Sequence, residues 1–409
     1  MEPRPVESPP AAADDAVDPG LIDDARILVV DDDEFISAMA QAYLEHAGFS
    51  RIETATDGQT CLDRLHASPP DIVILDLQMP VVGGLDVLRR MRETPALADV
   101  PVLVTTGIDE SQERNEAIRA GANSLISKPF DAPLLIEKTR SLIERQILVQ
   151  QLNLYRERVS RELEMAKELQ LALLPSDEMI AYVRERYGCR VSSRFRSSSE
   201  LAGDFWGLQP LNNSQLAVYS VDISGHGVAA AANTFRLHEI IQSEDMHALP
   251  PADFLARVNQ RFHARIPAGQ FATILYGVID VAADSFTYAS AAAPPPIIGR
   301  PGAGAPRYLE NRGILAGATS RARFSTYQAT LRTGDYLFLY SDALPEASTS
   351  TGELLGDDAP ARFLTDALSR DPDDPLPTLM DAFYARTTAT PQDDLTLIYV
   401  RRGPQETGG

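Results

Sequence analysis

The sequence predicts a doubly wound α/β domain, then a long helical linker, then an α+β domain with a β-sandwich flanked by helices. Three observations predict this order. Short apolar runs alternate with helical patterns from residue 25 to 144, and residues 134 to 174 contain neither Gly nor Pro. Longer strand-like runs then alternate with two main helical stretches from about residue 184 to 402. A chain of 409 residues is long enough for two or three domains, because single cores seldom exceed about 250 to 300 residues.

The two ends of the chain and its bulk composition limit the possible functions. Residues 1 to 24 are rich in Pro, Ala and Asp, so we expect a disordered lead-in, and residues 404 to 409 should form a short tail. A net charge of −21 argues against a nucleic-acid partner, because phosphate backbones attract Lys and Arg. With only Cys61 and Cys189 and no run of 18 apolar residues, we expect a cytoplasmic protein without disulfides or membrane association.

The first domain is expected over residues 25 to 133. Buried apolar runs at residues 27 to 30, 72 to 75 and 102 to 104 are separated by helical patterns, which predicts a parallel sheet. Ligands of such sheets bind at the carboxyl ends of the strands. The polar residues expected there are Asp31, Asp32, Asp76, Thr106 and Lys128.

This set of residues resembles that of two-component receiver domains over the whole domain. Mg²⁺ held by Asp31, Asp32 and Asp76 would let the Asp76 carboxylate accept a phosphoryl group despite the repulsion between like charges. The family pattern makes the Gln78 carbonyl a further metal ligand. The resemblance also implies a sensor histidine kinase as the partner that phosphorylates Asp76.

Two more residues of the receiver pattern would hold the phosphoryl oxygens, namely Thr106 and Lys128. The Lys128-Pro129 bond is a candidate cis peptide that would aim the lysine. One position departs from the pattern, because Leu125 stands where many receivers carry a switching aromatic residue.

Residues 134 to 175 are expected to form a helical linker that ends at Pro175. A heptad seam along this helix is apolar except at Arg145 and Glu162, which predicts a parallel coiled coil and a homodimer through residues 145 to 173. A single amphipathic helix packed on its own domain is the alternative. The seam positions are Arg145, Leu148, Leu152, Tyr155, Val159, Glu162, Ala166, Leu169 and Leu173.

Four aspartates in the last part of the chain stand at apparent strand ends beside glycine or small polar residues. Carboxylate oxygens are hard ligands suited to Mg²⁺ or Mn²⁺, and ligands so far apart in the sequence must be gathered by a folded sheet. Metal-dependent hydrolysis is therefore the leading hypothesis. The four residues are Asp204, Asp222, Asp342 and Asp393.

Most of residues 165 to 401 resembles the SpoIIE-like branch of the metal-dependent serine/threonine protein phosphatases, the PPM family. Each motif is short, but their order and spacing together are specific. The matching segments are residues 168 to 175, 202 to 207, 222 to 227, 271 to 280, 334 to 336, 340 to 342 and 392 to 396.

The resemblance implies a phosphatase domain over residues 176 to 403 that binds two Mn²⁺ or Mg²⁺ ions. Asp204 and Asp222 would bridge or flank the metal pair, and the Ile223 carbonyl would add a ligand. Asp342 and Asp393 would complete the shell of the first metal. His226 is either a general acid for the leaving serine alkoxide or a turn histidine with a local hydrogen bond.

The chain departs from this pattern at two places. Relatives often read Ala-Gly-His-Asn-Pro-Pro where residues 291 to 296 read Ala-Ala-Ala-Pro-Pro-Pro, and the usual Asp-Gly is Asp342-Ala343. Ala343 adds a side chain where the backbone is expected to pass close to a metal or substrate. Neither departure removes an expected metal carboxylate.

These observations predict a response regulator in which phosphorylated Asp76 controls a phosphoserine/phosphothreonine phosphatase. The resemblance suggests a phosphorylated anti-sigma-factor antagonist as substrate, within a partner-switching pathway. The alternative is an adaptor without catalytic activity that binds a sigma or anti-sigma factor under receiver control.

Overall fold

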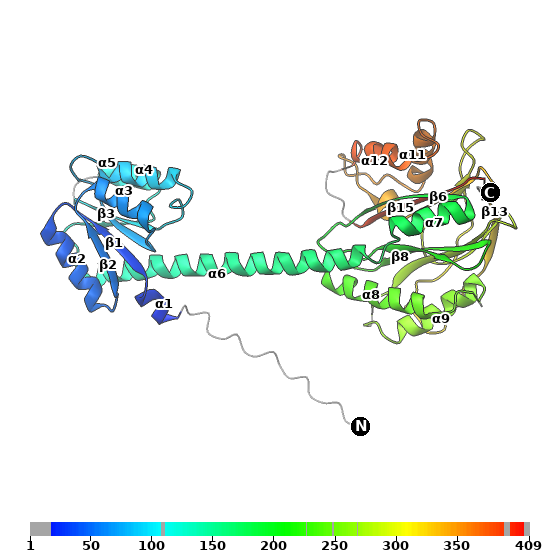
Figure 1. Cartoon of the computed structure of the whole chain (residues 1–409), viewed down its shortest axis with the longest axis horizontal. Coiled ribbons are helices and arrows are strands. Elements are labelled where there is room, and N and C mark those ends of the chain that lie inside the picture. The colour runs from blue at the N-terminus through cyan, green and yellow to red at the C-terminus, as the bar shows by residue number, and fades with distance from the viewer. Residues whose placement is uncertain are drawn as a thin grey trace, which may run out of the picture. The chain divides into compact units, whose positions relative to one another are not determined.

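The computed structural model describes residues 18–107, 111–225, 227–247, 249–267, 269–387 and 393–404 (Figure 1). The chain divides into two compact units, Met1–Val159 and Ser160–Gly409. The boundary falls inside helix α6 (Ala132–Leu171), which begins in the first unit and ends in the second. Among the described helices, none is both long and apolar enough to cross a membrane.

The first unit contains a five-stranded parallel sheet, as predicted, with the strand order β2-β1-β3-β4-β5. Strands β3 and β4 are buried at every residue because helices cover both faces. The strands are β1 (Arg26–Val30), β2 (Arg51–Ala55), β3 (Ile72–Asp76), β4 (Val102–Thr106) and β5 (Ser124–Ser127).

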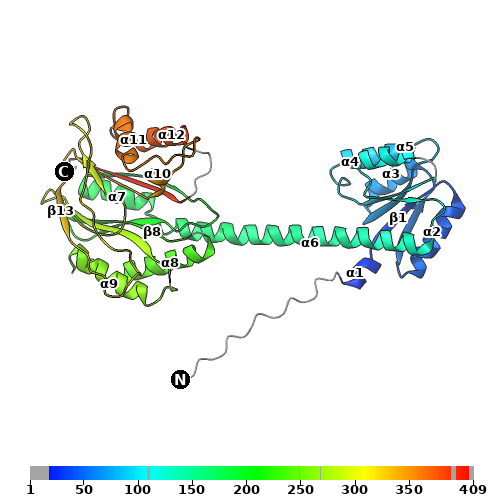
Figure 2. The same cartoon turned by 180° about the vertical axis from the view of Figure 1, so that it is seen from behind.

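Two hydrophobic clusters show which helices cover each face of this sheet (Figure 2). Side chains of α2 (Glu34–His46) and the first part of α6 pack on one face. Those of α3 (Gly58–Ala67), α4 (Gly84–Glu93) and α5 (Ser111–Arg119) pack on the other. The doubly wound α/β class predicted for this unit is confirmed.

The expected disordered lead-in is wrong for its last residues. Residues Pro19–Asp23 form helix α1, which begins with the Asp18 side chain accepting a hydrogen bond from the Gly20 amide. Ile22 is only 8% exposed and packs in the cluster beside α2 and α6. Burial of this one apolar side chain gives the segment a tertiary contact that its composition did not indicate. Residues 1–17 lie outside the described part of the chain.

The second unit is built on two five-stranded antiparallel sheets. The first sheet has the order β13 (Tyr327–Thr330), β10 (Ser285–Ala291), β9 (Ala272–Asp280), β8 (Gln215–Ile223) and β7 (Phe205–Pro210). The second has the order β12 (Arg307–Tyr308), β11 (Ile297–Gly299), β14 (Tyr336–Tyr340), β15 (Leu395–Arg402) and β6 (Cys189–Arg196).

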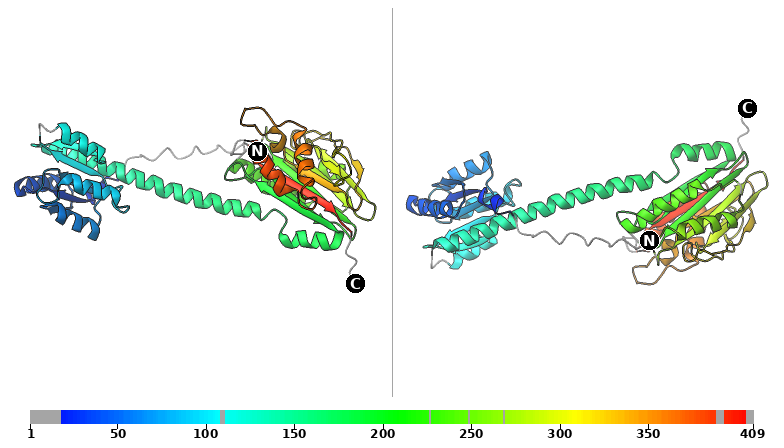
Figure 3. Two further views of the ribbon diagram at one scale, coloured as in Figure 1. Left: turned by 90° about the horizontal axis from the view of Figure 1, so that it is seen from above. Right: turned by 90° about the horizontal axis from the view of Figure 1, so that it is seen from below.

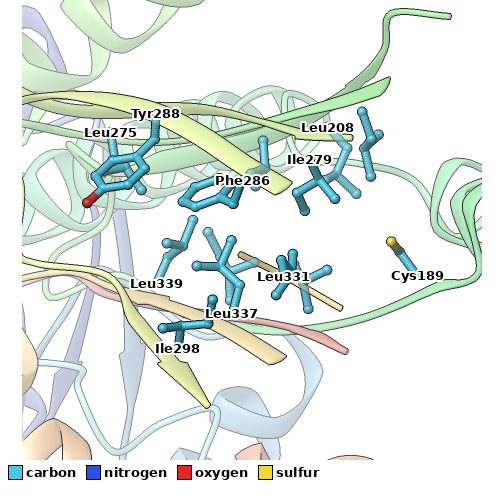
Figure 4. Close-up of a cluster of buried hydrophobic side chains, with 14 of the residues drawn as sticks. Cys189, Leu208, Leu275, Ile279, Phe286, Tyr288, Ile298, Leu331, Leu337 and Leu339 are labelled. Carbon is cyan, nitrogen blue, oxygen red and sulfur yellow. The ribbon is translucent and has the colours of Figure 1, made fainter. Parts of the chain in front are cut away.

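The core of the second unit lies between these sheets (Figure 4). Leu208, Leu275 and Phe286 of the first sheet point toward Ile298, Leu337 and Leu339 of the second. Alternate residues of a strand lie on opposite faces, so each strand also has an outer face that needs cover. The predicted β-sandwich is confirmed.

Helices cover both outer faces of the sandwich (Figure 3). Helices α8 (Val228–Ser243) and α9 (Pro251–His263) pack on the first sheet, close to the two helical stretches predicted. Helices α11 (Ala359–Leu368) and α12 (Leu376–Tyr384) pack on the second sheet and were not predicted. Each carries a proline in its first turn, where a missing N–H costs no helical hydrogen bond, so the proline does not exclude a helix. Helix α7 (Asp177–Tyr187) lies against β6.

Helix α6 has 40 residues and agrees with the predicted linker helix to within three residues at each end. Leu152, Tyr155 and Leu169 of the predicted seam are 65%, 68% and 63% exposed within the single chain. Exposed apolar residues also lie off the seam, at Leu154 and Met165.

Candidate functional sites

The polar residues predicted at the carboxyl ends of the parallel strands lie together in the first unit. Asp31 follows β1, Asp76 ends β3 and Lys128 follows β5. The Lys128 Nζ is 2.6 Å from Asp31 Oδ2 and 2.8 Å from Asp76 Oδ2. Asp31 and Asp76 are buried, so this lysine is the cation that balances two desolvated carboxylates.

The three acidic residues of this site fit a divalent cation. Ligand oxygens of Asp31, Asp32 and Asp76 lie within 4.8 Å of one another, and all are hard donors. The Gln78 backbone N–H donates to the Asp76 carboxylate. The predicted role of the Gln78 carbonyl as a metal ligand stays a prediction.

Burial and mutual contact shift the pKa values of both Asp76 and Lys128. Desolvation raises the pKa of Asp76 and outweighs the opposing effect of Lys128. Desolvation alone would lower the pKa of Lys128, but its hydrogen bonds to Asp31 and Asp76 raise it overall. The lysine side chain is more exposed than either aspartate, which explains why it keeps its charge more easily.

The remaining receiver residues also lie where the sequence placed them. Thr106 is buried at the end of β4, and the Lys128-Pro129 peptide bond is cis, as predicted. Helix α4 begins close to the end of β3, since a Cβ on Gly84 would lie 2.0 Å from the Asp76 carbonyl oxygen. Only glycine fits at this position without a shift of the backbone.

The aspartates of the second unit meet at one end of the sandwich. Asp204 precedes β7, and Asp222 lies near the end of the neighbouring antiparallel strand β8. Their side chains share a hydrogen bond. A Cβ on Gly203 would lie 2.7 Å from the Ile223 carbonyl oxygen, so glycine permits this carbonyl, a predicted ligand, to lie beside the Asp204 backbone.

Asp342 and Asp393 reach the same end of the sandwich from the second sheet. Asp342 follows β14, and Asp393 precedes β15, its antiparallel neighbour. The Ser341 hydroxyl donates to the Asp394 carbonyl oxygen at 2.9 Å and accepts from the Thr396 N–H at 2.9 Å. This double contact holds the end of one strand to the start of the other. Asp393 lies close enough to Asp342 for its charge to raise the pKa of that carboxyl.

The four carboxylates create a strongly acidic site. Desolvation, followed by repulsion from Asp342 and Asp393, raises the pKa of Asp222 to about 7. Desolvation and Asp393 raise the pKa of Asp342 to about 6. Burial and the neighbouring Asp222 raise the pKa of Asp204 well above its usual range. Carboxylate oxygens are ligands suited to divalent cations such as Mg²⁺ or Mn²⁺. Among the described residues, however, only Asp31, Asp32 and Asp76 form a group whose ligand oxygens all lie within 4.8 Å of one another.

The backbone at Ala343 has a conformation that alanine accepts. It is the first residue of the short helix α10 (Ala343–Glu346), and the preceding Asp342 has φ −63° and ψ −21°. Alanine is favourable in this helical conformation, so glycine is not required there. The second departure from the family pattern, at residues 291 to 296, places alanine where relatives often have glycine. Ala292 has φ 55°, in the left-handed region that glycine prefers, so this backbone conformation costs free energy.

Four polar residues around Asp204 were missed by the sequence analysis. Thr396 Oγ1 donates to Asp204 Oδ2 at 2.6 Å, and Asp394 accepts from the Gly203 amide at 2.6 Å. Gln170 of α6 bonds to both the N–H and the carbonyl oxygen of Ala202, at 3.0 and 2.8 Å. Thr234 of α8 donates to the Gly203 carbonyl oxygen at 3.2 Å.

A sequence signal existed for two of these residues. Leu395 and Leu397 pack on the helices α11 and α12. Because alternate residues of a strand lie on opposite faces, Asp394 and Thr396 face the space between the two sheets. Gln170 lies in the matching segment of residues 168 to 175, but its partner is a backbone group distant in the chain and was not predicted. No sequence signal identifies Thr234, whose partner is also a distant backbone group. His226 and Gln392 lie outside the described residues.

Comparison with known proteins matches each of the two parts of the chain to a family. Residues 27–140 match the response regulator receiver domain family, and residues 212–403 match the family of stage II sporulation protein E, SpoIIE. The chain is a response regulator that joins a receiver domain to a SpoIIE-type PPM phosphatase domain.

Individual relatives cover one part of this response regulator each. It is 40% identical over 120 residues to response regulator MprA of Mycolicibacterium vanbaalenii, covering 29% of this chain and 51% of that protein. It is 30% identical over 202 residues to RpaA of Synechocystis, described as a DNA-binding dual master transcriptional regulator, covering 45% of this chain and 78% of that protein. The chain thus spans about half the length of MprA.

A solved structure matches the second unit of the response regulator. The SiaA-PP2C domain of Pseudomonas aeruginosa superposes with a TM-score of 0.54 at 18% identity, covering 60% of this chain and 97% of that domain. At this identity the match shows the shared fold alone.

Proposed function

We propose that the response regulator is a metal-dependent phosphoserine/phosphothreonine protein phosphatase controlled by phosphorylation of Asp76. The observation that carries this proposal is the convergence of Asp204, Asp222, Asp342 and Asp393 at one end of the sandwich, with raised pKa values at three of them. Carboxylates that repel one another in a partly desolvated site are stabilised by bound cations.

These four aspartates and the Ile223 carbonyl would hold two Mn²⁺ or Mg²⁺ ions. Such ions would neutralise the phosphoryl oxygens and activate water for the hydrolysis of a phosphate ester. Thr396 orients the Asp204 carboxylate, and Gly203 brings the Ile223 carbonyl close. In the receiver, Asp31, Asp32 and Asp76 would hold Mg²⁺, and Thr106 and Lys128 would contact the phosphoryl oxygens on Asp76.

The proposed substrate is a phosphorylated anti-sigma-factor antagonist in a partner-switching pathway, and the proposed phosphodonor is a sensor histidine kinase. Both follow from the SpoIIE-type and receiver families. The proposed assembly is a homodimer through residues 145–173. The exposure of Leu152, Tyr155 and Leu169 supports it, since a second copy of α6 would cover these side chains.

The test is Mn²⁺-dependent hydrolysis of p-nitrophenyl phosphate and of a phosphoserine peptide by the full chain. We expect the wild type to require metal and Asp222→Asn to lose most of its activity. Asp371→Asn is the matched control, because this exposed aspartate lies away from the site in the loop before α12. Metal-saturated wild type that hydrolyses neither these substrates nor candidate antagonist proteins would favour the adaptor alternative.

A further inference from the structure

Asp393 and Asp394 are adjacent in sequence but have opposite surroundings. Asp393 is exposed and faces Asp222 and Asp342. Asp394 is 4% exposed, and both of its oxygens accept hydrogen bonds. Its Oδ2 accepts from the Gly203 N–H at 2.6 Å, and its Oδ1 accepts from the Ser198 N–H and hydroxyl at 2.7 and 3.0 Å.

These donors occupy the oxygens of Asp394, although its charge also raises the pKa values of Asp204 and Asp222. Three hydrogen bonds balance much of its negative charge, and the positive ends of the same groups disfavour a cation beside it. Asp393 accepts one hydrogen bond, from the Asp394 N–H to its Oδ1 at 2.8 Å, and its charge raises the pKa values of Asp222 and Asp342. Asp394 is therefore the more fully hydrogen-bonded of the two.

The contacts of Asp394 lead directly to Asp204. Gly203 immediately precedes Asp204, whose carboxylate is held by Thr396, two residues after Asp394 on the same face of β15. Asp394, just before β15, thus holds the backbone next to Asp204, and Thr396 of β15 holds the Asp204 side chain. Both contacts join segments about 190 residues apart, at sequence separations of 191 and 192.

We infer that Asp394 is a positioning residue for the metal pair, which sets the location of Asp204 through Gly203 and does not itself bind metal. This inference rests on the proposed function only in taking Asp204 as a metal ligand. Groups that orient metal ligands typically change metal affinity about 10- to 100-fold when they are removed. Asp394→Ala should therefore weaken metal binding and leave the number of bound ions unchanged.

The experiment is calorimetric titration of the full chain with Mn²⁺, in an Asp31→Asn background that weakens the receiver site. Asp394→Ala should bind the same number of ions about 10-fold or more weakly. Asp394→Asn should lose less affinity, because its remaining carbonyl oxygen can still accept from Gly203. Asp393→Asn is the matched comparison, and it should reduce the number of ions bound because it removes a ligand.

The outcomes separate the possibilities. Wild-type Mn²⁺ affinity in a folded Asp394→Ala protein would overturn the inference, as would a lower ion number in Asp394→Asn. If circular dichroism shows that Asp394→Ala does not fold, the Mn²⁺ affinity and the number of ions bound by Asp394→Asn decide instead. A wild type that binds Mn²⁺ but hydrolyses no phosphoester would refute the proposed function and leave this inference standing, whereas a phosphatase unit that binds no Mn²⁺ refutes both.

Discussion

At the residue scale, four carboxylates of the second unit repel one another, and a bound cation would relieve this repulsion. Asp204, Asp222, Asp342 and Asp393 come from four segments, and the fold brings them together although their charges oppose it. The hydrogen bonds from Thr396 Oγ1 to Asp204 and from the Gly203 N–H to Asp394 hold the geometry. Repulsion among the four carboxylates should therefore lower the free energy of unfolding of the metal-free protein, by an amount that depends on pH.

The direction of that dependence follows from the raised pKa values. Folding raises the pKa of Asp222 to about 7 and that of Asp342 to about 6, from about 3.9 in the unfolded chain. Between about pH 4 and pH 7 the folded state therefore binds more protons, and metal-free stability falls as pH rises through this window. Urea denaturation of the metal-free protein at pH 5 and pH 8 measures this fall.

Asp222→Asn removes one of the repelling charges. We expect it to stabilise the metal-free protein by about 1 to 3 kcal/mol at pH 8 and by much less at pH 5. Added Mn²⁺ should stabilise the wild type more than the variant. Equal stability of the two proteins at pH 8 would show that repulsion by the Asp222 carboxylate does not destabilise the metal-free fold.

Ala292 offers a second test at this scale. An L-residue in the left-handed region costs about 1 to 2 kcal/mol, and Ala292 has φ 55°. Ala292→Gly should therefore raise the free energy of unfolding by about 0.5 to 1 kcal/mol, after the entropy cost of glycine. Ala291→Gly, one residue earlier in strand β10, is the control and should destabilise the protein.

At the element scale, strand β15 shows what the sequence could and could not predict. Its apolar run predicted a strand, and the preceding Asp393 was predicted as a metal ligand. The contact partners of Asp394 and Thr396 were not predictable, because hydrogen bonds to Gly203 and Asp204 depend on how two sheets pack. Helices α11 and α12 were not predicted. Each carries a proline, which interrupts a helix interior but is tolerated in the first turn that it occupies here.

Helix α6 carries a prediction about assembly. If its seam pairs with a second copy, Val159→Glu should convert a dimer to a monomer, because a buried unpaired charge costs several kcal/mol. Multi-angle light scattering measures this change, and phosphorylation of Asp76 should remain intact. Gln150→Glu, at an exposed off-seam position, should leave the mass unchanged. An unchanged mass for Val159→Glu would favour the single amphipathic helix.

The last turn of α6 carries a different prediction. Gln170→Leu removes both hydrogen bonds to Ala202, and each buried backbone group left unpaired costs about 1 to 3 kcal/mol. We expect lower stability together with lower Mn²⁺-dependent hydrolysis, because Ala202 lies two residues before Asp204. Gln150→Leu on the exposed surface of the same helix is the control, and it should match the wild type in thermal unfolding and in rate.

At the scale of the whole molecule, one phosphorylated side chain should control the output. Asp76 ends a fully buried strand, and Lys128 lies at its carboxylate. Acetyl phosphate with Mg²⁺ should therefore label the wild type, whereas Asp76→Asn should take up no label and its phosphatase rate should not respond. Asp99→Asn, an exposed substitution in the same unit, should be labelled normally. Labelling of Asp76→Asn would show that another residue accepts the phosphoryl group.

The two hydrogen bonds between Gln170 and Ala202 also determine at which residue a truncated fragment of the second unit should begin. A fragment that starts at residue 176, where the sequence suggested a domain boundary, would lack this glutamine and expose the amide it protects. Such a fragment could be misjudged as inactive because of its missing helical turn. A catalytic fragment that begins near residue 160, at the start of the second compact unit, retains the glutamine and gives a sound basis for enzymology and crystallisation.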